Sequence, residues 1–372
     1  MKAMDLELRR TVEARIARAR GLLQARGWQA LWVGASTNLR YLSGVVEKPS
    51  ERLFGAFIPL EGDPFMLVPR LYHDEMADLS AIADVKSWSD EEGMAAALRR
   101  ACPLEPGSTL AIDPLLQASF VFLFQEQLSG VRLVSAGDLL GELRLRKDDY
   151  EKDCLRRVAG LADAVMSEVT RASLVGRTER QVAERIEQLF RELGSEGVSF
   201  SPIVSAGPNA AYPHHQPDDT VIAEGQGVVL DFGGVYRGYA SDITRTVFMG
   251  QPPAELRRIY SVVREAQQLA VERLRPGMAA SAADAVAREH IAEAGYGPAF
   301  VHRLGHGIGL DVHEPPYLVE GNAARLDPGC AFSVEPGIYV PGLGGVRIED
   351  IVFMNADGAE RLNSVSRELL GL

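Results

Sequence analysis

Three histidines stand close together in a glycine-containing segment near the C-terminal end of the chain. His302, His306 and His313 lie in HRLGHGIGLDVHEPP, whereas the whole chain has only 7 histidines. A neutral imidazole binds transition metals, and histidine also transfers protons near pH 7. Glycine lets the backbone crowd a bound ion because it has no side chain. The segment therefore indicates a site whose other members must be sought elsewhere.

Two aspartates in apolar, strand-like runs are the first candidate partners. Asp231 in VVLDFGG and Asp242 in ASDITRTVFM are symmetric about the Tyr236–Arg237 step. A tight hairpin turning there places the two carboxylates directly opposite one another, with Cβ atoms about 4.5 to 5.5 Å apart. Like charges in this position repel unless a proton or a cation lies between them.

A second pair of acids is also placed symmetrically about a predicted turn. Glu335 and Glu349, in VEPGIYVPGLGGVRIE, are symmetric about Gly342. Four carboxylates carry a charge that two divalent cations would balance. An oxygen-rich set with a single imidazole suits Mn²⁺ or a similar ion better than the Cys and His sites of structural zinc. Two such ions can acidify a shared water and polarise a carbonyl, so the chemistry indicated is hydrolysis.

The elements that must position these residues fall into two predicted domains. From about residue 28 to 135, short β-rich runs (ALWVG, FGAFIPL, FMLVP, TLAID, VRLVS) alternate with helical stretches, which predicts an α/β domain. A charged stretch at 142–153 marks a boundary, so we expect domains at 1–144 and 145–372. In the second domain, strands among helices without strict alternation predict an α+β fold with mostly antiparallel strands.

One helix of the second domain has a clear start and end in the sequence. Thr178 followed by Gln181 forms a predicted capping box, and Gly194 is the expected end of the helix that it opens. Two further stretches, PAELRRIYSVVREAQQLAVERL and SAADAVAREHIAEAG, have the same helical character.

Composition narrows the class of protein. The 372 residues carry a net charge of −12, which argues against nucleic acid or an anionic membrane as the main partner. No apolar run is long enough to span a bilayer, and the N-terminal MKAMDLELRRTVEARIARARGLL is a charged amphipathic pattern, so we expect a cytoplasmic enzyme. Cys102, Cys154 and Cys330 lack metal or disulfide spacing and are interpreted as reduced thiols.

Five motifs in this order resemble one known family. LDFGG, ASDITRT, GHGIGLDVHE, SVEPG and GVRIED are similar to those of the Xaa-Pro dipeptidases (prolidases) and aminopeptidases P, dinuclear metallopeptidases of pita-bread (creatinase/aminopeptidase) fold. The resemblance covers about 145 to 372 well and the preceding creatinase-type α/β domain more weakly. It implies small peptide substrates with proline second, and a homodimer.

The resemblance also implies a ligand set for two divalent metal ions, with Mn²⁺ favoured and Co²⁺ or Zn²⁺ as alternatives. Asp231 corresponds to the chelating ligand of one ion, Asp242 and Glu349 to bridging ligands, and His306 and Glu335 to ligands of the other. In the family's mechanism, a hydroxide that bridges the two metals attacks the carbonyl before proline. The residue corresponding to Glu335 accepts its proton and passes it to the leaving nitrogen.

Further residues are implied at the substrate. His313 resembles the histidine that contacts substrate and stabilises the transition state, and His214 one that approaches the scissile group. His302 resembles a wall of the proline pocket. Arg347 resembles an arginine that either supports the metal ligands or faces the substrate. Tyr212 and Tyr339 are candidates for lining the pocket or for the core, while His73, His215 and His290 have no assigned role.

Alternatives remain at this stage. A pita-bread protein without catalysis, or the metal-free creatinase branch, would lack ligands that are all present here, and a methionine aminopeptidase would not need the N-terminal domain. Dipeptidase and aminopeptidase P are harder to separate. A dipeptidase must recognise a free carboxylate, for which an arginine fork is suited. Arg40 and Arg52 are N-terminal candidates, and our hypothesis is that Arg52, with Arg347, favours dipeptides.

Overall fold

The computed structural model describes residues 6–372 and contains two compact units, Met1–Arg144 and Leu145–Leu372. The predicted N-terminal helix is observed as α1 from Leu6, and residues 1–5 of that prediction lie outside the described residues. No helix within residues 6–372 is long and apolar enough to cross a membrane. The three cysteines are free and buried.

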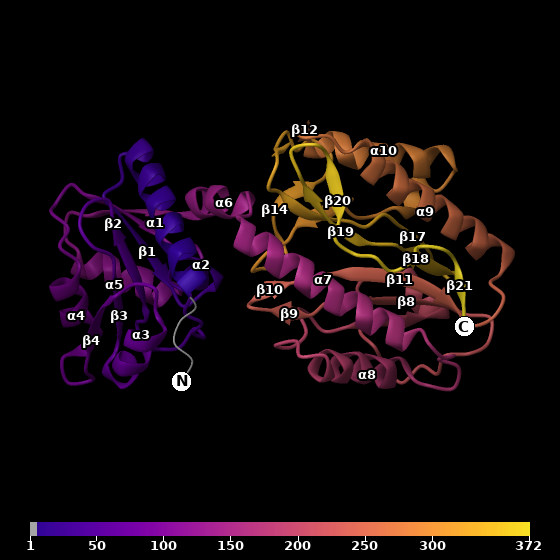
Figure 1. Ribbon diagram of the computed structural model, residues 1–372, viewed down its shortest axis with the longest axis horizontal. Coiled ribbons are helices and arrows are strands. Elements are labelled where there is room, and N and C mark those ends of the chain that lie inside the picture. Colours follow the sequence, from indigo (N-terminus) through magenta and orange to yellow (C-terminus); the bar gives the residue numbers. More distant parts are fainter. Residues whose placement is uncertain (1–5) are drawn as a thin grey trace. The chain divides into compact units, whose positions relative to one another are not determined.

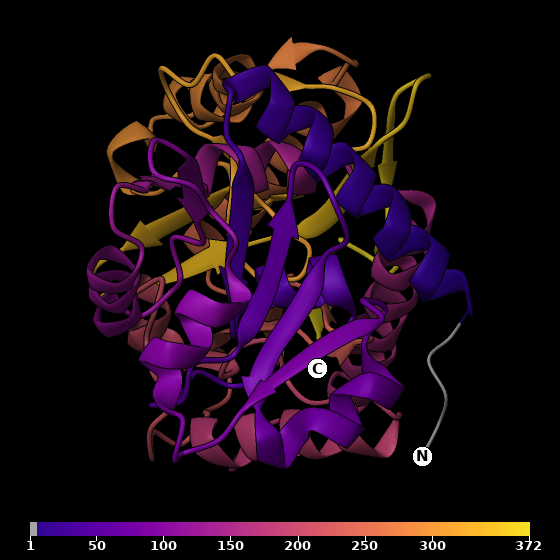
Figure 2. The same cartoon turned by 90° about the vertical axis from the view of Figure 1, so that its left-hand side faces the viewer.

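The N-terminal unit is an α/β domain around one mixed sheet of order β4-β3-β2-β1-β5-β6 (Figures 1 and 2). Strands β1 and β5, β5 and β6, and β3 and β4 pair in parallel, and β2 pairs antiparallel with both of its neighbours. The five strand-like runs of the sequence all form strands. The strands are β1 (Ala30–Gly34), β2 (Gly55–Pro59), β3 (Phe65–Pro69), β4 (Asp84–Trp88), β5 (Thr109–Ile112) and β6 (Arg132–Ser135). The helices are α1 (Leu6–Arg26), α2 (Thr37–Ser43), α3 (His73–Leu79), α4 (Gly93–Ala101), α5 (Ala118–Gln127) and α6 (Gly137–Leu145).

The C-terminal unit is built on two mostly antiparallel sheets, each with its own pair of helices (Figure 1). The first sheet, β21-β11-β8-β7, shares a core with α7 and α8, and the second, β14-β13-β16-β19-β20, shares one with α9 and α10. The helices are α7 (Asp149–Val169), α8 (Glu179–Glu192), α9 (Ala254–Arg273) and α10 (Ala280–Glu293). The first sheet contains β7 (Ile203–Ala206), β8 (Gly227–Phe232), β11 (Ile243–Phe248) and β21 (Leu370–Gly371). The second contains β13 (Gly305–Gly307), β14 (Glu314–Leu318), β16 (Ala331–Val334), β19 (Asp350–Met354) and β20 (Ala359–Arg361).

Short two-stranded ladders complete the unit. They are formed by β9 (Val235–Tyr236) with β10 (Tyr239–Ala240), β12 (Met278–Ala279) with β15 (Arg325–Leu326), and β17 (Gly337–Val340) with β18 (Gly344–Arg347). The capping box predicted at the start of α8 is present, because Thr178 and Gln181 exchange side-chain and backbone hydrogen bonds. Gly194 follows the helix with φ +83°, a backbone conformation that glycine adopts without strain.

The first carboxylate hairpin turns one residue later than predicted. Tyr236 pairs with Tyr239, so the turn residues are Arg237 and Gly238, both with positive φ as a type I′ turn requires. Asp231 therefore pairs with Thr244, and the prediction that it stands directly opposite Asp242 is wrong. The physical reason is that the second central position of a type I′ turn favours glycine, and Gly238 occupies this position only when the turn is centred on Arg237 and Gly238. A one-residue shift of the turn moves the partner by two residues and keeps Asp242 on the same face, diagonal to Asp231.

The second hairpin has the predicted register. Val340 pairs with Gly344 in the β17–β18 ladder, and Val334 pairs with Asp350 in the β16–β19 ladder. Both pairs are symmetric about Gly342, so one register runs through both ladders and leaves Glu335 opposite Glu349 in the break between them.

Arg245 of β11 connects the two sheets of the C-terminal unit. Its guanidinium lies 2.6 Å from the Asp350 carboxylate of β19 and donates to the backbone oxygen of Glu349, also at 2.6 Å. The side chains of Arg245 and Asp350 are 4% and 0% exposed. Removing one member of a buried ion pair leaves the other charge without its partner, which is costly.

We expect Arg245→Ala to lower the free energy of unfolding by about 3 to 5 kcal/mol, measured by urea denaturation. The matched control is Arg180→Ala, because Arg180 pairs with Asp219 while the two side chains are 53% and 83% exposed. That substitution should change stability by less than about 1 kcal/mol. Equal effects of the two substitutions would show that Arg245 does not hold the sheets together.

Candidate metal centre and active site

A cavity of about 660 Å³ in the C-terminal unit collects most of the residues selected from the sequence. All the predicted metal ligands line it: Asp231, Asp242, His306, Glu335 and Glu349. So do four of the residues predicted to act at the substrate: His214, His302, His313 and Arg347. Residues that are more than a hundred positions apart in the chain are thus brought to one chamber by the two sheets.

Both sheets contribute predicted ligands at the point where they meet. Asp231 is the last residue but one of β8, and Asp242 directly precedes β11. Glu349 lies between β18 and β19 and forms a single antiparallel bridge with Thr244 of β11. The ligand atoms of Asp242, His306 and Glu349 all lie within 4.8 Å of one another. The described residues therefore form a compact cage of carboxylates and one imidazole.

The glycines beside His306 serve the packing of its strand. A Cβ at Gly305 would stand 2.0 Å from the Ser333 backbone oxygen, and one at Gly307 would stand 2.2 Å from that of Pro315. Glycine at both positions lets β13 lie against β16 and β14. The two glycines thus make room for the backbone of the neighbouring strands. This close packing fixes His306 in place.

His306 presents one ring nitrogen to the carboxylates. Its Nδ1 lies 3.0 Å from the Gly307 backbone oxygen, so Nδ1 carries the proton and donates. Its Nε2 lies 3.3 Å from Glu335 and 3.6 Å from Asp242. Burial, reinforced by the charge of His313, lowers the pKa of His306 to about 3. The ring is neutral at physiological pH, which is the form that binds a metal.

The carboxylates of the cage are crowded and incompletely hydrogen-bonded. Asp231 Oδ1, Asp242 Oδ1 and Glu349 Oε1 are buried without a hydrogen-bond partner among the described residues. Burial and the charge of neighbouring carboxylates raise the pKa of Asp242 and of Glu349 well above the ordinary range. Burial also raises the pKa of Glu335 to about 7. Orphaned, mutually repelling oxygens of this kind are what bound divalent cations would satisfy, so the residues fit a metal centre.

Arg347 is hydrogen-bonded to the cage. It donates to Asp231 at 2.5 Å, to the Tyr339 hydroxyl at 2.7 Å and to Thr244 Oγ1 at 3.2 Å. Thr244 in turn donates to Glu349 at 2.6 Å. Of the two roles left open for Arg347, its contacts favour support of the metal ligands.

His302 is engaged through both ring nitrogens. Nδ1 lies 2.8 Å from the Arg303 backbone oxygen, and Nε2 lies 2.9 Å from the hydroxyl of Tyr339. Burial lowers the pKa of His302 to about 4, so the ring is neutral. With both nitrogens occupied, His302 is suited to form a wall rather than to transfer a proton. Tyr339, 5% exposed, is a buried hydrogen-bonding residue and not part of the cavity lining.

His313 and His214 lie at the cavity with more exposed side chains. The His313 ring stands edge-on to that of His306, with centroids 4.2 Å apart. Burial and the nearby charge of Arg303 lower the pKa of His313. Both histidines can therefore reach a bound molecule without competing for the metal cage.

Tyr212 and Arg52, both predicted to act at the substrate, are not among the residues that line the cavity. Tyr212 is 63% exposed and does not line it, because the chain leaves a short 3₁₀ helix (Gly207–Ala211) there and the lining residues that follow are Pro213, His214 and Gln216. Arg52 belongs to the N-terminal unit and binds Asp90 through two hydrogen bonds of 2.6 and 3.1 Å. Its role in selecting dipeptides stays a prediction.

Arg303 was missed by the sequence reasoning. It lines the cavity, and its guanidinium stands 4.5 Å from the centre of the Tyr317 ring. No carboxylate among residues 6–372 is within ion-pair distance of it. The signal was its position, next to His302 and three residues before His306, inside the segment already identified as a site.

Models of two known families match the chain. That of metallopeptidase family M24 matches residues 153–356, and that of the Creatinase/Prolidase N-terminal domain matches residues 15–146. The first range contains every residue of the cage.

Similar proteins are known over nearly the whole length. Probable dipeptidase PepE of Mycobacterium tuberculosis is 40% identical over 366 residues, covering 96% of this chain and 95% of that protein. The Xaa-Pro dipeptidase of Lactobacillus delbrueckii subsp. lactis is 37% identical over 352 residues, covering 93% and 96%. The crystal structure of recombinant prolidase from Thermococcus sibiricus has a TM-score of 0.91 at 37% identity and covers 97% and 99%.

Metal removal should make stability depend on pH with a definite sign. Glu335 has a folded-state pKa of about 7, above its usual 4.5, and the pKa of Asp242 and Glu349 is raised too. Their protonated forms stabilise the metal-free fold at low pH, and this stability is lost as pH rises through the folded-state pKa. We expect the Tm of chelated protein to fall by several degrees between pH 5 and 8.

Addition of Mn²⁺ should abolish most of that fall, because the cations replace the protons between the carboxylates. Asp242→Asn removes one of the repelling charges and should raise the Tm of chelated protein at pH 8 while weakening the response to metal. A chelated protein whose Tm is flat or rises over this pH range would contradict the crowded-cage interpretation.

Proposed function

This chain belongs to metallopeptidase family M24, with a creatinase-type α/β domain before a pita-bread catalytic domain, and from this premise we propose that it is a dinuclear Xaa-Pro dipeptidase. The observation that carries the proposal is the buried cage, in which Asp231, Asp242 and Glu349 each leave an oxygen without a partner among the described residues. The names of the similar proteins, dipeptidase and Xaa-Pro dipeptidase, support the substrate class.

We propose that Asp231 would hold one ion, that His306 and Glu335 would hold the other, and that Asp242 and Glu349 would contribute to both. The oxygen-rich set favours Mn²⁺, with Co²⁺ or Zn²⁺ as alternatives. Two divalent ions held there would acidify a shared water and polarise the scissile carbonyl.

Glu335 is the acid best placed to move a proton. Its side chain is 15% exposed, whereas those of Asp242 and His306 are 7% and 3% exposed, so it is the more accessible from the cavity. The Ser333 hydroxyl donates to it at 3.0 Å and fixes its orientation. The bond before proline is a tertiary amide, and its nitrogen must be protonated to leave. Glu335 accepts the proton from the attacking water and passes it to that nitrogen.

The histidines complete the substrate site. His313 donates to the oxygen on which charge develops, and His214 contacts the scissile group. His302, neutral and held by Tyr339, forms a wall against the pyrrolidine ring. No part of this arrangement needs the buried Arg347 to leave Asp231.

Arg303 suits the free carboxylate that distinguishes a dipeptide. For Arg52 to bind this group it would first have to leave Asp90, whereas Arg303 lines the cavity without a carboxylate partner among residues 6–372. A guanidinium matches a carboxylate through two parallel hydrogen bonds. Arg303 therefore favours dipeptides over longer peptides.

The activity is tested with Ala-Pro, Met-Pro and an Xaa-Pro-containing tripeptide, using chelated protein and protein with Mn²⁺ restored. We expect metal-dependent cleavage with the dipeptides preferred. Preference for the tripeptide would instead assign an aminopeptidase P, and cleavage of neither with metal bound would support a binding protein. Glu335→Gln should lower kcat by about 10² to 10⁴. Metal content measured on the same sample separates loss of proton transfer from loss of an ion.

Arg303→Ala should lower kcat/KM for Ala-Pro by about 10- to 100-fold, because a charge-assisted bidentate contact contributes roughly 1.5 to 3 kcal/mol. Hydrolysis of Ala-Pro amide, which lacks the carboxylate, should change little. The same substitution at Arg52 is the comparison that decides between the two arginines. An equal loss on the amide would contradict recognition of the carboxylate by Arg303.

The homodimer and the cytoplasmic location implied at the sequence level stay predictions. Light scattering of the purified protein measures the first directly.

A further inference from the structure

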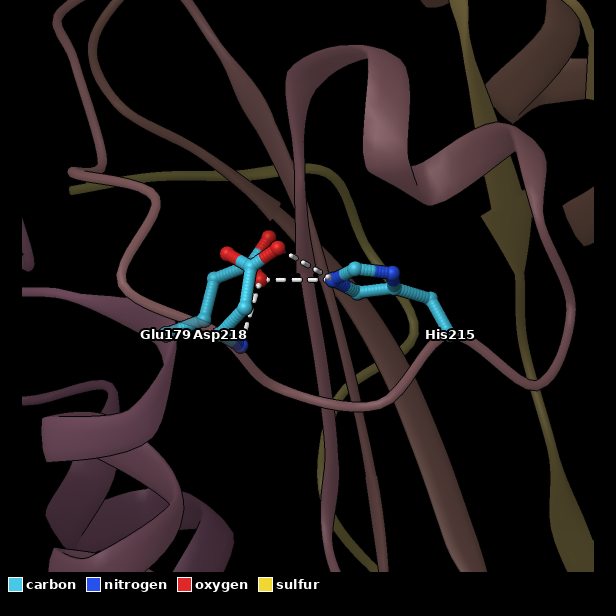
Figure 3. A group of neighbouring side chains, drawn as sticks. All are labelled: Glu179, His215 and Asp218. Carbon is cyan, nitrogen blue, oxygen red and sulfur yellow. Dashed lines mark hydrogen bonds and ion pairs between the residues drawn. The ribbon is translucent and has the colours of Figure 1, made fainter.

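A second group of titratable side chains lies outside the metal cage. Glu179, His215 and Asp218 converge beside the start of α8, with the His215 ring directed at the two carboxylates (Figure 3). Glu179 is the first residue of α8, and its side chain is 0% exposed. A fully buried carboxylate away from the catalytic chamber requires a physical reason.

The oxygens of Glu179 are already satisfied by the protein. Oε1 accepts from the backbone N–H of Ala206 at 2.7 Å and from Asn209 Nδ2 at 3.1 Å. Oε2 accepts from His215 Nε2 at 2.7 Å and from the backbone N–H of Asp218 at 3.2 Å. With two donors on each oxygen, this carboxylate needs no cation, in contrast to the orphaned oxygens of the cage. The group is therefore not a second metal site.

All four donors come from one segment, residues 206–218. This segment leaves β7, passes through the short 3₁₀ helix and contains Pro213 and His214, which line the catalytic cavity. The backbone N–H of His215 donates to the Tyr212 oxygen at 3.1 Å, which closes a turn around His214. Glu179 is thus hydrogen-bonded to both ends of the segment, Ala206 and Asp218, and to His215, the residue next to His214.

We infer that Glu179 is a positioning residue, which holds His214 at the active site by binding His215 and the backbone of segment 206–218. The two neighbouring histidines have different partners, since His215 is bound to the buried carboxylate whereas His214 is left at the cavity. Because the carboxylate is fixed in the first turn of α8, the segment cannot shift without losing several charge-assisted hydrogen bonds at once. The inference rests on the proposed role of His214 in peptide hydrolysis.

The test is a double-mutant cycle on the full-length protein with Mn²⁺. His215→Ala should lower kcat/KM for Ala-Pro by about 10- to 100-fold, the usual effect of losing a residue that orients a catalytic group. His215→Gln keeps an N–H donor for Glu179 and should recover most of the activity. In a His214→Ala background, His215→Ala should have almost no further effect, because residues that act as a unit are not additive.

Tm and metal content are measured for every variant, since a merely structural role would lower stability and leave the two effects multiplicative. Glu179→Gln is a second substitution for the same cycle and should behave like His215→Ala. Arg180→Ala, the adjacent exposed residue paired with Asp219, is the matched control and should leave activity unchanged.

The outcomes are distinguishable. If His214→Ala itself leaves hydrolysis unchanged, the proposed role of His214 fails and the inference falls with it. If His214→Ala lowers the rate but His215→Ala and Glu179→Gln do not, or if their losses multiply with that of His214→Ala, positioning by Glu179 is overturned. Loss of the His215→Ala effect in the His214→Ala background, with recovery in His215→Gln, supports it.

Discussion

Repulsion among buried carboxylates is the constraint on which the rest of the C-terminal unit depends. Asp231, Asp242 and Glu349 are at most 7% exposed, and Glu335 stands beside them. Isolated buried carboxylates take up protons rather than remain charged, and here burial and mutual repulsion both act in that direction. Divalent cations would remove this repulsion, because they supply positive charge to the carboxylate oxygens that no hydrogen-bond donor of the protein reaches. Function and fold are therefore coupled through the same oxygens.

Two buried arginines, one on β18 and one on β11, place positive charge next to these carboxylates. Arg347 lies against Asp231, and Arg245 binds Asp350 together with the backbone oxygen of Glu349. These arginines do not satisfy the whole cage, because one oxygen each of Asp231, Asp242 and Glu349 remains unpartnered among the described residues. Instead they fix the strands that carry the ligands, and the single bridge between Thr244 and Glu349 joins the sheets at the same place. Such rigidity keeps a ligand geometry in place before metals bind.

Features set by residues close together in the sequence could be predicted, whereas contacts between distant segments could not. The register that opposes Glu335 and Glu349 was predictable, because one symmetric ladder extends to both sides of the pair. The Asp231 and Asp242 pair was displaced by a turn preference at Gly238, although period-two alternation kept both on one face. Pairing between the two sheets has no periodic signal, so the bridge from Thr244 to Glu349 could not be foreseen.

The same limit applied to single residues. Tyr212 stands two positions before His214, but sequence proximity does not determine which side chains of an irregular segment face inward. Glu179 could be interpreted only as a helix-start residue, since acids are favoured there by the helix dipole. Its four donors come from a segment 27 or more residues away along the chain, and only the fold brings them together.

Histidine chemistry shows how environment, rather than residue type, assigns roles within one chamber. His306 is buried with one nitrogen on a backbone oxygen and the other directed at carboxylates, which suits it to the proposed role of a metal ligand. His302 uses both nitrogens for protein contacts and is left with its ring surface. His214 and His313 keep exposed rings at the cavity. Because the roles of His302 and His306 are set by the partners of their ring nitrogens, changing a partner such as Tyr339 should alter the role of His302 without touching the histidine itself.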